Sequence, residues 1–95
     1  MADRRAPNKP SPRARSAAPH RVILYGKPGC HLCEIAEQLL IGLGREFSLT
    51  IEKVDVRSDA VLLAQYGDRI PVISIDGRVL LAAPIRSQDL RSALV

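Results

Sequence analysis

Two cysteines, Cys30 and Cys33, carry the clearest chemical signal in the sequence. They are the only cysteines of the chain, and two residues, His31 and Leu32, separate them. On a helix this spacing places both side chains on one face, close enough to form a disulfide bond. Two thiols in this arrangement can reduce another molecule's disulfide by way of a mixed disulfide. The motif therefore indicates thiol–disulfide exchange.

The two sulfurs are expected to have different roles. Cys30 follows Gly29 and begins a predicted helix, where free backbone N–H groups and the positive end of the helix dipole favour a thiolate over a thiol. Cys33 lies one turn further along the helix and is expected to be more shielded from solvent. We therefore predict that Cys30 attacks the substrate disulfide and that Cys33 resolves the mixed disulfide.

Metal binding is the second chemistry open to a C-x-x-C pair, which can form half of a zinc site or ligate an iron–sulfur cluster. The chain has no other cysteine, and its only histidines are His20 and His31. A complete ligand set would need a second subunit or glutathione. We expect no metal ligands and no permanently bound cofactor.

The first half of the predicted fold is a strand, a helix and a second strand. Val22 to Tyr25 is a short apolar run typical of a buried strand. Residues 30–44 have apolar side chains at three- and four-residue steps, which predicts a helix with one buried stripe. That stripe would contain Leu32, Ile35, Ala36, Leu39, Leu40 and Leu43. Residues 49–56 predict a strand whose apolar positions slip in phase, which indicates a bulge or an edge position.

The second half of the predicted fold is a helix, a β-hairpin and a last helix. A short helix is expected to be capped by Ser58 and to pack through Leu62, Leu63 and Tyr66. Strands over 72–75 and 79–82 flank the turn Asp76-Gly77, and a helix capped by Ser87 follows. The order βαβαββα predicts an α/β fold in which the first two strands are parallel and helices cover both faces of the sheet.

A family resemblance agrees with this order. The segment from Leu24 to Cys33 (LYGKPGCHLC), together with Ile70-Pro71-Val72 and Asp76-Gly77, resembles the glutaredoxin-like branch of the thioredoxin superfamily. The resemblance covers residues 21–95 and implies a four-stranded mixed sheet of the thioredoxin/glutaredoxin fold. It also implies a cis peptide bond before Pro71, beside the sulfurs, and pairing of an extended substrate with the backbone at Ile70.

Three charged or polar residues, two of them close to the cysteines in sequence, have expected roles of their own. Lys27 stands three residues before Cys30, where glutaredoxins often have lysine, so it is expected to stabilise the thiolate or bind a glutathione carboxylate. His31 would favour the thiolate further when protonated. A surface lysine and a solvent-facing histidine are the alternative interpretations. Asp55, at the end of the second strand, is interpreted as structural.

Two segments depart from the glutaredoxin pattern. Glutaredoxins typically have Thr-Val-Pro before the hairpin and a Gly-Gly-x-Asp loop before the last helix, and these groups hold glutathione. Here the corresponding stretches begin Arg69-Ile70-Pro71 and Ala82-Ala83-Pro84. Without the glycine pair, close approach of the backbone to the ligand is hindered. Arg69 or Arg86 would have to bind a carboxylate instead, although solvation at the surface is the simpler role for both.

The predicted function is that of an enzyme that reduces protein or glutathione-mixed disulfides and contributes to cell redox homeostasis. The expected partners are protein disulfides, and the expected electron donor is glutathione or a thioredoxin-reductase-type system. A non-catalytic thioredoxin-fold binding module is the remaining alternative.

Charge is concentrated in the first part of the chain. Residues 1–21 contain six basic residues and one acidic residue, whereas residues 22–95 contain eight basic and nine acidic residues, within a total formal charge of +4. We predict a disordered basic tail over 1–20 and one domain over 21–95. The domain lacks the interleaved aromatic and basic residues of a nucleic-acid platform. No signal peptide or membrane span is predicted, so we expect a cytoplasmic monomer that acts on neither membranes nor nucleic acids.

Overall fold

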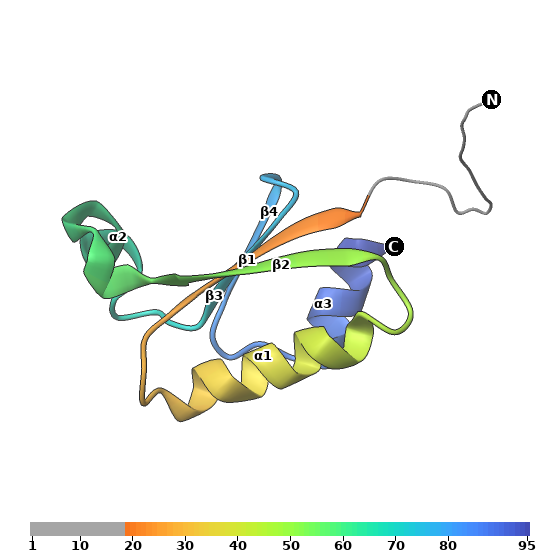
Figure 1. The fold of residues 1–95 in the computed structure, drawn as a ribbon, viewed down its shortest axis with the longest axis horizontal. Coiled ribbons are helices and arrows are strands. Elements are labelled where there is room, and N and C mark those ends of the chain that lie inside the picture. Colours follow the sequence, from red (N-terminus) through yellow and green to blue (C-terminus); the bar gives the residue numbers. More distant parts are fainter. Residues whose placement is uncertain (1–18) are drawn as a thin grey trace.

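The computed structural model describes residues 19–95 (Figure 1). Its elements are β1 (His20–Gly26), α1 (His31–Leu43), β2 (Leu49–Asp55), a 3-10 turn (Val56–Ser58), α2 (Ala60–Tyr66), β3 (Val72–Ile75), β4 (Val79–Ala82) and α3 (Ser87–Leu94). The predicted order βαβαββα is confirmed. The predicted disordered tail lies outside the described residues, apart from its end, where β1 already begins at His20.

The four strands form one mixed sheet in the order β2-β1-β3-β4. β1 and β2 are parallel over seven residue pairs, from His20 opposite Leu49 to Gly26 opposite Asp55. β3 runs antiparallel to both β1 and β4. Of the two expected explanations for the slip in phase, the edge position of β2 is confirmed, and a bulge is excluded because the register with β1 is unbroken. The strand ends at Asp55, and Val56 is buried as part of the turn that follows.

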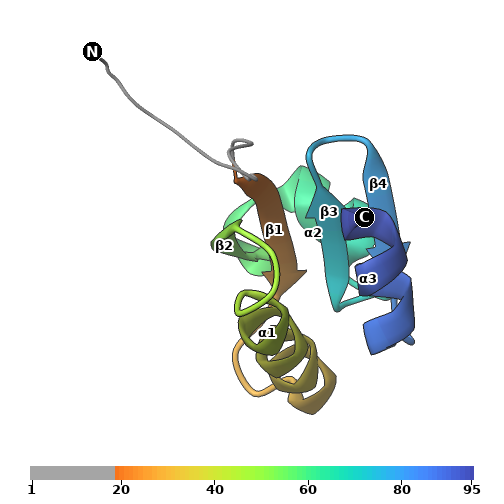
Figure 2. The ribbon, with the colours of Figure 1, turned by 90° about the vertical axis from the view of Figure 1, so that its right-hand side faces the viewer.

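One face of the sheet packs against α1 and α3, which lie on the same side of it (Figure 2). The central side chains of this core include Leu40, Ile73 and Leu90, each with no measurable exposure. Burying a leucine-sized side chain stabilises a fold by about 1.5–3 kcal/mol, so this layer holds α1 in place. The start of α1, which carries the two cysteines, is thereby set at the end of the sheet.

The buried stripe of α1 differs from the one predicted. Leu32 is 55% exposed and Ile35 is 43% exposed, so both were wrongly placed in the core. The face of α1 that meets the sheet instead contains Cys33, Ala36, Leu40 and Leu43. A helix that rests on a sheet buries only one side, and this rotation buries Cys33 while leaving the flanking apolar residues in solvent.

The other face of the sheet is approached by α2, which lies at one end of it (Figure 1). The ring of Tyr66 meets that of Tyr25, with centroids 5.0 Å apart. Tyr25 alternates with the core residue Leu24 along β1 and therefore points to the opposite face. The prediction that helices cover both faces is confirmed. Leu63, however, is exposed and does not share the packing role of Tyr66.

Both predicted serine caps are wrong. The cap of α2 is Asp59, whose carboxylate accepts the N–H of Val61 at 2.7 Å, while the Ser58 hydroxyl donates to a backbone oxygen. α3 begins at Ser87 itself, and Arg86 precedes it without a capping side-chain bond. Within the described part of the chain, no helix is long and apolar enough to cross a membrane.

Candidate functional site

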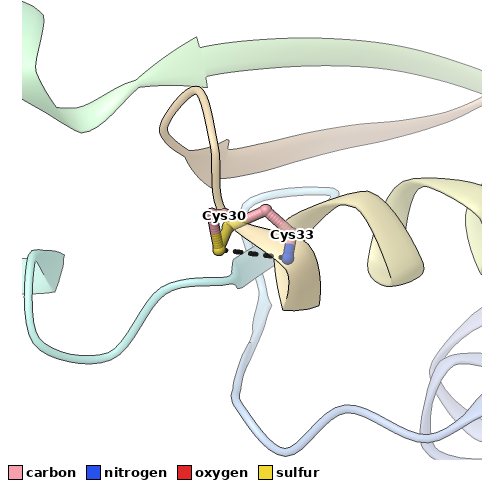
Figure 3. Close-up of a disulfide and its surroundings, with 2 residues drawn as sticks. All are labelled: Cys30 and Cys33. Carbon is pink, nitrogen blue, oxygen red and sulfur yellow. Dashed lines mark hydrogen bonds between the residues drawn. A yellow bond between two sulfur atoms is a disulfide. The ribbon is translucent and has the colours of Figure 1, made fainter.

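The two cysteines lie together at the start of α1 (Figure 3). Cys30 has an extended backbone and forms the N-cap of the helix, and Cys33 lies in the first turn. Their sulfurs are joined in a disulfide, and their Cα atoms are 5.2 Å apart. The backbone N–H of Cys33 donates a hydrogen bond to Sγ of Cys30 at 3.1 Å. A sulfur atom thus takes the place of the side-chain oxygen that usually caps a helix.

Cys30 and Cys33 differ in their exposure to solvent. Cys33 is only 7% exposed, whereas Cys30 is half-buried. Cys30 also sits where the unpaired N–H groups and the dipole of α1 attract negative charge. In the reduced protein the same N–H of Cys33 can stabilise a thiolate on Cys30. The arrangement places one half-buried cysteine at the N-terminus of α1 and one buried cysteine within bonding distance of it.

Gly26, at the end of β1, and Pro71, just before β3, lie at the end of the sheet that faces Cys30 and Cys33. A Cβ atom on Gly26 would lie 3.0 Å from Sγ of Cys33, so a side chain there would crowd the sulfur and require it to shift. The antiparallel pairing of Tyr25 with Val72 places Pro71 opposite Gly26, just beyond the last pair. The segment that leads into β3 therefore reaches the cysteines, as drawn in Figure 3.

The peptide bond between Ile70 and Pro71 is cis, as the family resemblance implied. Pro71 is buried, and its carbonyl accepts the N–H of Ala83 at 3.0 Å. Ile70 is half-buried and, within residues 19–95, takes part in no backbone hydrogen bond of a turn or loop. Its backbone therefore has pairing capacity beside the disulfide.

A cleft of about 380 Å³ lies beside Cys33, the buried cysteine of the pair. It lies between the loop after β1, the first turns of α1 and the end of β2, and Cys33 forms part of its wall. The residues that line it are Leu24, Gly26, Lys27, Pro28, Gly29, Cys33, Glu34, Glu37, Lys53, Val54 and Asp55. Sequence reasoning did not find Glu37 or Lys53, because their proximity depends on how α1 packs beside β2.

Ion pairs order three of the five charged groups of this cleft, namely Glu37, Lys53 and Asp55. Lys53 Nζ lies 3.2 Å from Oε1 of Glu37. Arg57 holds Asp55 through its Nη2 at 2.8 Å, and its side-chain and backbone hydrogen bonds lower the pKa of that carboxyl. Asp55 also accepts the backbone N–H of Arg57 at the start of the 3-10 turn, which agrees with its interpretation as structural.

The remaining predicted residues lie around the site. Lys27 is exposed and lines the cleft, and His31 is exposed as the first residue of α1, outside the lining of the cleft. Arg86 pairs with Asp89 at 3.3 Å, while Arg69 is exposed. Within residues 19–95, no group of three or more His, Cys, Asp or Glu side chains is arranged to hold a metal ion.

Comparisons with known proteins agree with this geometry. Residues 21–95 match the model of a family described as a glutaredoxin-like domain (DUF836), and a comparison with curated proteins found no match.

Three solved structures resemble the fold. A protein from Nitrosomonas europaea is 25% identical, with a TM-score of 0.75 over 85% of this chain and 98% of its own. A protein from X. campestris is 32% identical, with a TM-score of 0.66 over 77% and 93% of the two chains. A mutant thioredoxin from Halobacterium salinarum is 19% identical, with a TM-score of 0.63 over 79% and 71%, which shows the shared thioredoxin-like fold alone.

Proposed function

This chain belongs to the glutaredoxin-like domain family (DUF836), and we propose that it is a thiol–disulfide oxidoreductase that uses Cys30 and Cys33 as its redox pair. One observation carries the proposal. The half-buried Cys30 sulfur caps α1 and accepts a backbone N–H, one helical turn from a buried sulfur to which it is already bonded. A helix N-terminus favours the thiolate, which is the nucleophile of disulfide exchange.

The reaction balances with these two sulfurs alone. The Cys30 thiolate attacks one sulfur of a substrate disulfide, and the other substrate sulfur leaves as a thiolate that takes a proton from solvent. Cys33 then attacks Sγ of Cys30, which closes the Cys30–Cys33 disulfide and releases the second substrate thiol. The substrate gains two electrons and two protons. The protein loses two electrons and the proton of Cys33, and solvent supplies the other proton. Two glutathione molecules or one dithiol donor reverse these steps and restore the protein.

Protein disulfides are the proposed substrates, with the extended chain beside the disulfide pairing with the backbone of Ile70. The loop after β4 supports this choice over small glutathione mixed disulfides. The N–H of Ala83 is already bonded to Pro71, and Pro84 has no N–H to donate. Each missing contact of this kind costs about 1–3 kcal/mol, and every 1.4 kcal/mol weakens binding about tenfold.

Lys27 and His31 are proposed to act on the charge of the site rather than in bond making. Lys27 lines the cleft next to Cys33, and His31 follows Cys30 directly in an exposed position. A positive charge at either position would favour the thiolate of Cys30. Replacing Lys27 by Gln should therefore raise the pH at which Cys30 becomes reactive.

The proposed substrate class is tested by kcat/KM on a protein disulfide and on a small glutathione mixed disulfide. Each is assayed with glutathione and with a thioredoxin-reductase system as donor. We expect the protein disulfide to be reduced more efficiently. Efficient glutathione-driven turnover of the small substrate, with weak reduction of the protein, would show that the loop after β4 does not impair glutathione binding.

A further inference from the structure

The resolving step needs a place for a proton. As a thiol, Cys33 must lose its proton before or while it attacks Sγ of Cys30. Cys33 is 7% exposed, so bulk water has little direct access to its sulfur. Cys33 lines the cleft beside α1, and water can reach its sulfur through this cleft. A cleft of about 380 Å³ with several polar side chains is roomy enough to hold water molecules.

Five charged groups face this cleft, and they are not equivalent. Lys27 comes from the loop after β1, Glu34 and Glu37 from α1, and Lys53 and Asp55 from β2. Lysine ammonium groups cannot accept a proton.

The carboxylates differ in their partners and in their positions. Both oxygens of Asp55 accept hydrogen bonds from the guanidinium of Arg57, which lowers the pKa of that carboxyl and makes it a poor acceptor. Glu34 also lines the cleft, but it is exposed and directly follows Cys33 in sequence. Neighbouring positions of a helix project in different directions, so Glu34 does not stand one turn from Cys33 on the same face.

Glu37 lies on the same face of α1 as Cys33 and lines the same cleft. It stands four residues after Cys33 on α1, and side chains at this spacing lie on the same face of a helix, one turn apart. Its side chain is 29% exposed, and Lys53 Nζ lies 3.2 Å from Oε1, which orients the carboxylate from the β2 side of the cleft. The carboxylate can receive a proton through one water molecule and pass it on to solvent.

We propose that Glu37 accepts the proton of Cys33 during resolution of the mixed disulfide, with Lys53 positioning its carboxylate. This inference rests on the proposed function. The S–H bond of Cys33 breaks as its sulfur bonds to Cys30, the proton passes by water to Glu37, and the bond between Cys30 and the substrate sulfur breaks. The substrate leaves as a thiolate that takes a proton from solvent, and Glu37 returns its proton to solvent.

A purely electrostatic role for Glu37 would change the rate of resolution in the opposite direction. A negative charge near Cys33 disfavours its thiolate, so neutralising Glu37 would accelerate resolution if charge repulsion were its only effect. Loss of a proton acceptor slows the same step. The direction of the change in rate therefore separates the two roles.

The experiment follows the reaction of the reduced protein with Ellman's disulfide by rapid mixing. The first release of coloured thiolate reports attack by Cys30 and depends on reagent concentration, and the second reports attack by Cys33 and does not. In the Glu37→Gln protein we expect the second phase to be at least ~10-fold slower near neutral pH. The two proteins should converge at alkaline pH, where Cys33 ionises unaided, and the first phase should be unchanged.

Glu34→Gln is the matched control, since it removes the same charge from the same cleft, and its second phase should stay within about twofold of wild type. Glu37→Asp keeps a carboxylate and should resolve faster than Glu37→Gln. An unchanged or faster second phase in Glu37→Gln overturns the inference, as does equal slowing in all three variants. A wild-type protein that releases only one coloured thiolate per molecule would instead refute the proposed function.

Discussion

The sulfur of Cys30 is predicted to stabilise the fold as well as to carry the chemistry. Its hydrogen bond from the Cys33 N–H, at 3.1 Å, satisfies one of the unpaired donors at the start of α1. Serine is a good N-cap and alanine is not, so Cys30→Ser should retain this bond and Cys30→Ala should lose it. Removing an N-cap costs about 1 kcal/mol in most proteins, which corresponds to about 4–8 °C in Tm for a domain of this size.

The comparison is made between the two variants, because neither can form the internal disulfide. Both should lose disulfide reduction completely, and Cys30→Ala should melt about 4–8 °C below Cys30→Ser. Circular dichroism melting under reducing conditions, with urea unfolding as a second measure, gives the difference. Equal stability of the two variants would mean that the Cys30 side chain does not cap α1, and the argument for a stabilised thiolate would lose its structural basis.

Three further predictions concern the scaffold. Gly26→Val should push Cys33 out of position, because a Cβ would lie 3.0 Å from its sulfur, and urea unfolding should show a loss of about 1–3 kcal/mol. Leu40→Ala, at a fully buried position, should cost about 2–5 kcal/mol by the same method. The hydrogen bond from His20 lowers the pKa of Asp76, so that carboxylate stabilises the fold above its unfolded pKa of about 3.9 and loses this effect as the pH falls through its lower folded pKa. Asp76→Asn should flatten the acid limb of stability below about pH 4, as measured by Tm against pH.

Local sequence signals were sufficient for the order of elements and for the position of the redox pair. The signals lie within a few residues of one another: an apolar run, a glycine-rich turn, and a cysteine at the start of a helical pattern. The resemblance added the cis bond before Pro71, which is present in the structure. These features need no knowledge of which distant segments meet.

The misplaced details depend on tertiary packing. Apolar spacing alone could not decide which side of α1 meets the sheet, since Leu32 and Ile35 fit a helical stripe as well as Ala36 and Leu40 do. Packing against the sheet determines which side of α1 is buried, and this buried side includes Cys33. The choice of Asp59 over Ser58 as a cap was similarly open, because both types accept backbone N–H groups.

The cleft beside Cys33 could not be predicted for the same reason. Glu37 and Lys53 are sixteen residues apart, and their ion pair exists only because α1 packs next to β2. The loop after β1 closes the third side, and no residue pattern within that loop indicates a cavity. A salt bridge between a helix and an edge strand is a property of the folded arrangement.

Trapping of a substrate on Cys30 tests the central claim most directly. Reduced Cys33→Ser and Cys30→Ser proteins are each mixed with a disulfide-bonded protein, and the covalent products are identified by non-reducing electrophoresis and mass spectrometry. The account predicts a stable mixed disulfide on Cys30 in the Cys33→Ser protein and none in the Cys30→Ser protein. A mixed disulfide that forms mainly on Cys33, or no adduct in either variant, would contradict the assignment of Cys30 as the attacking sulfur.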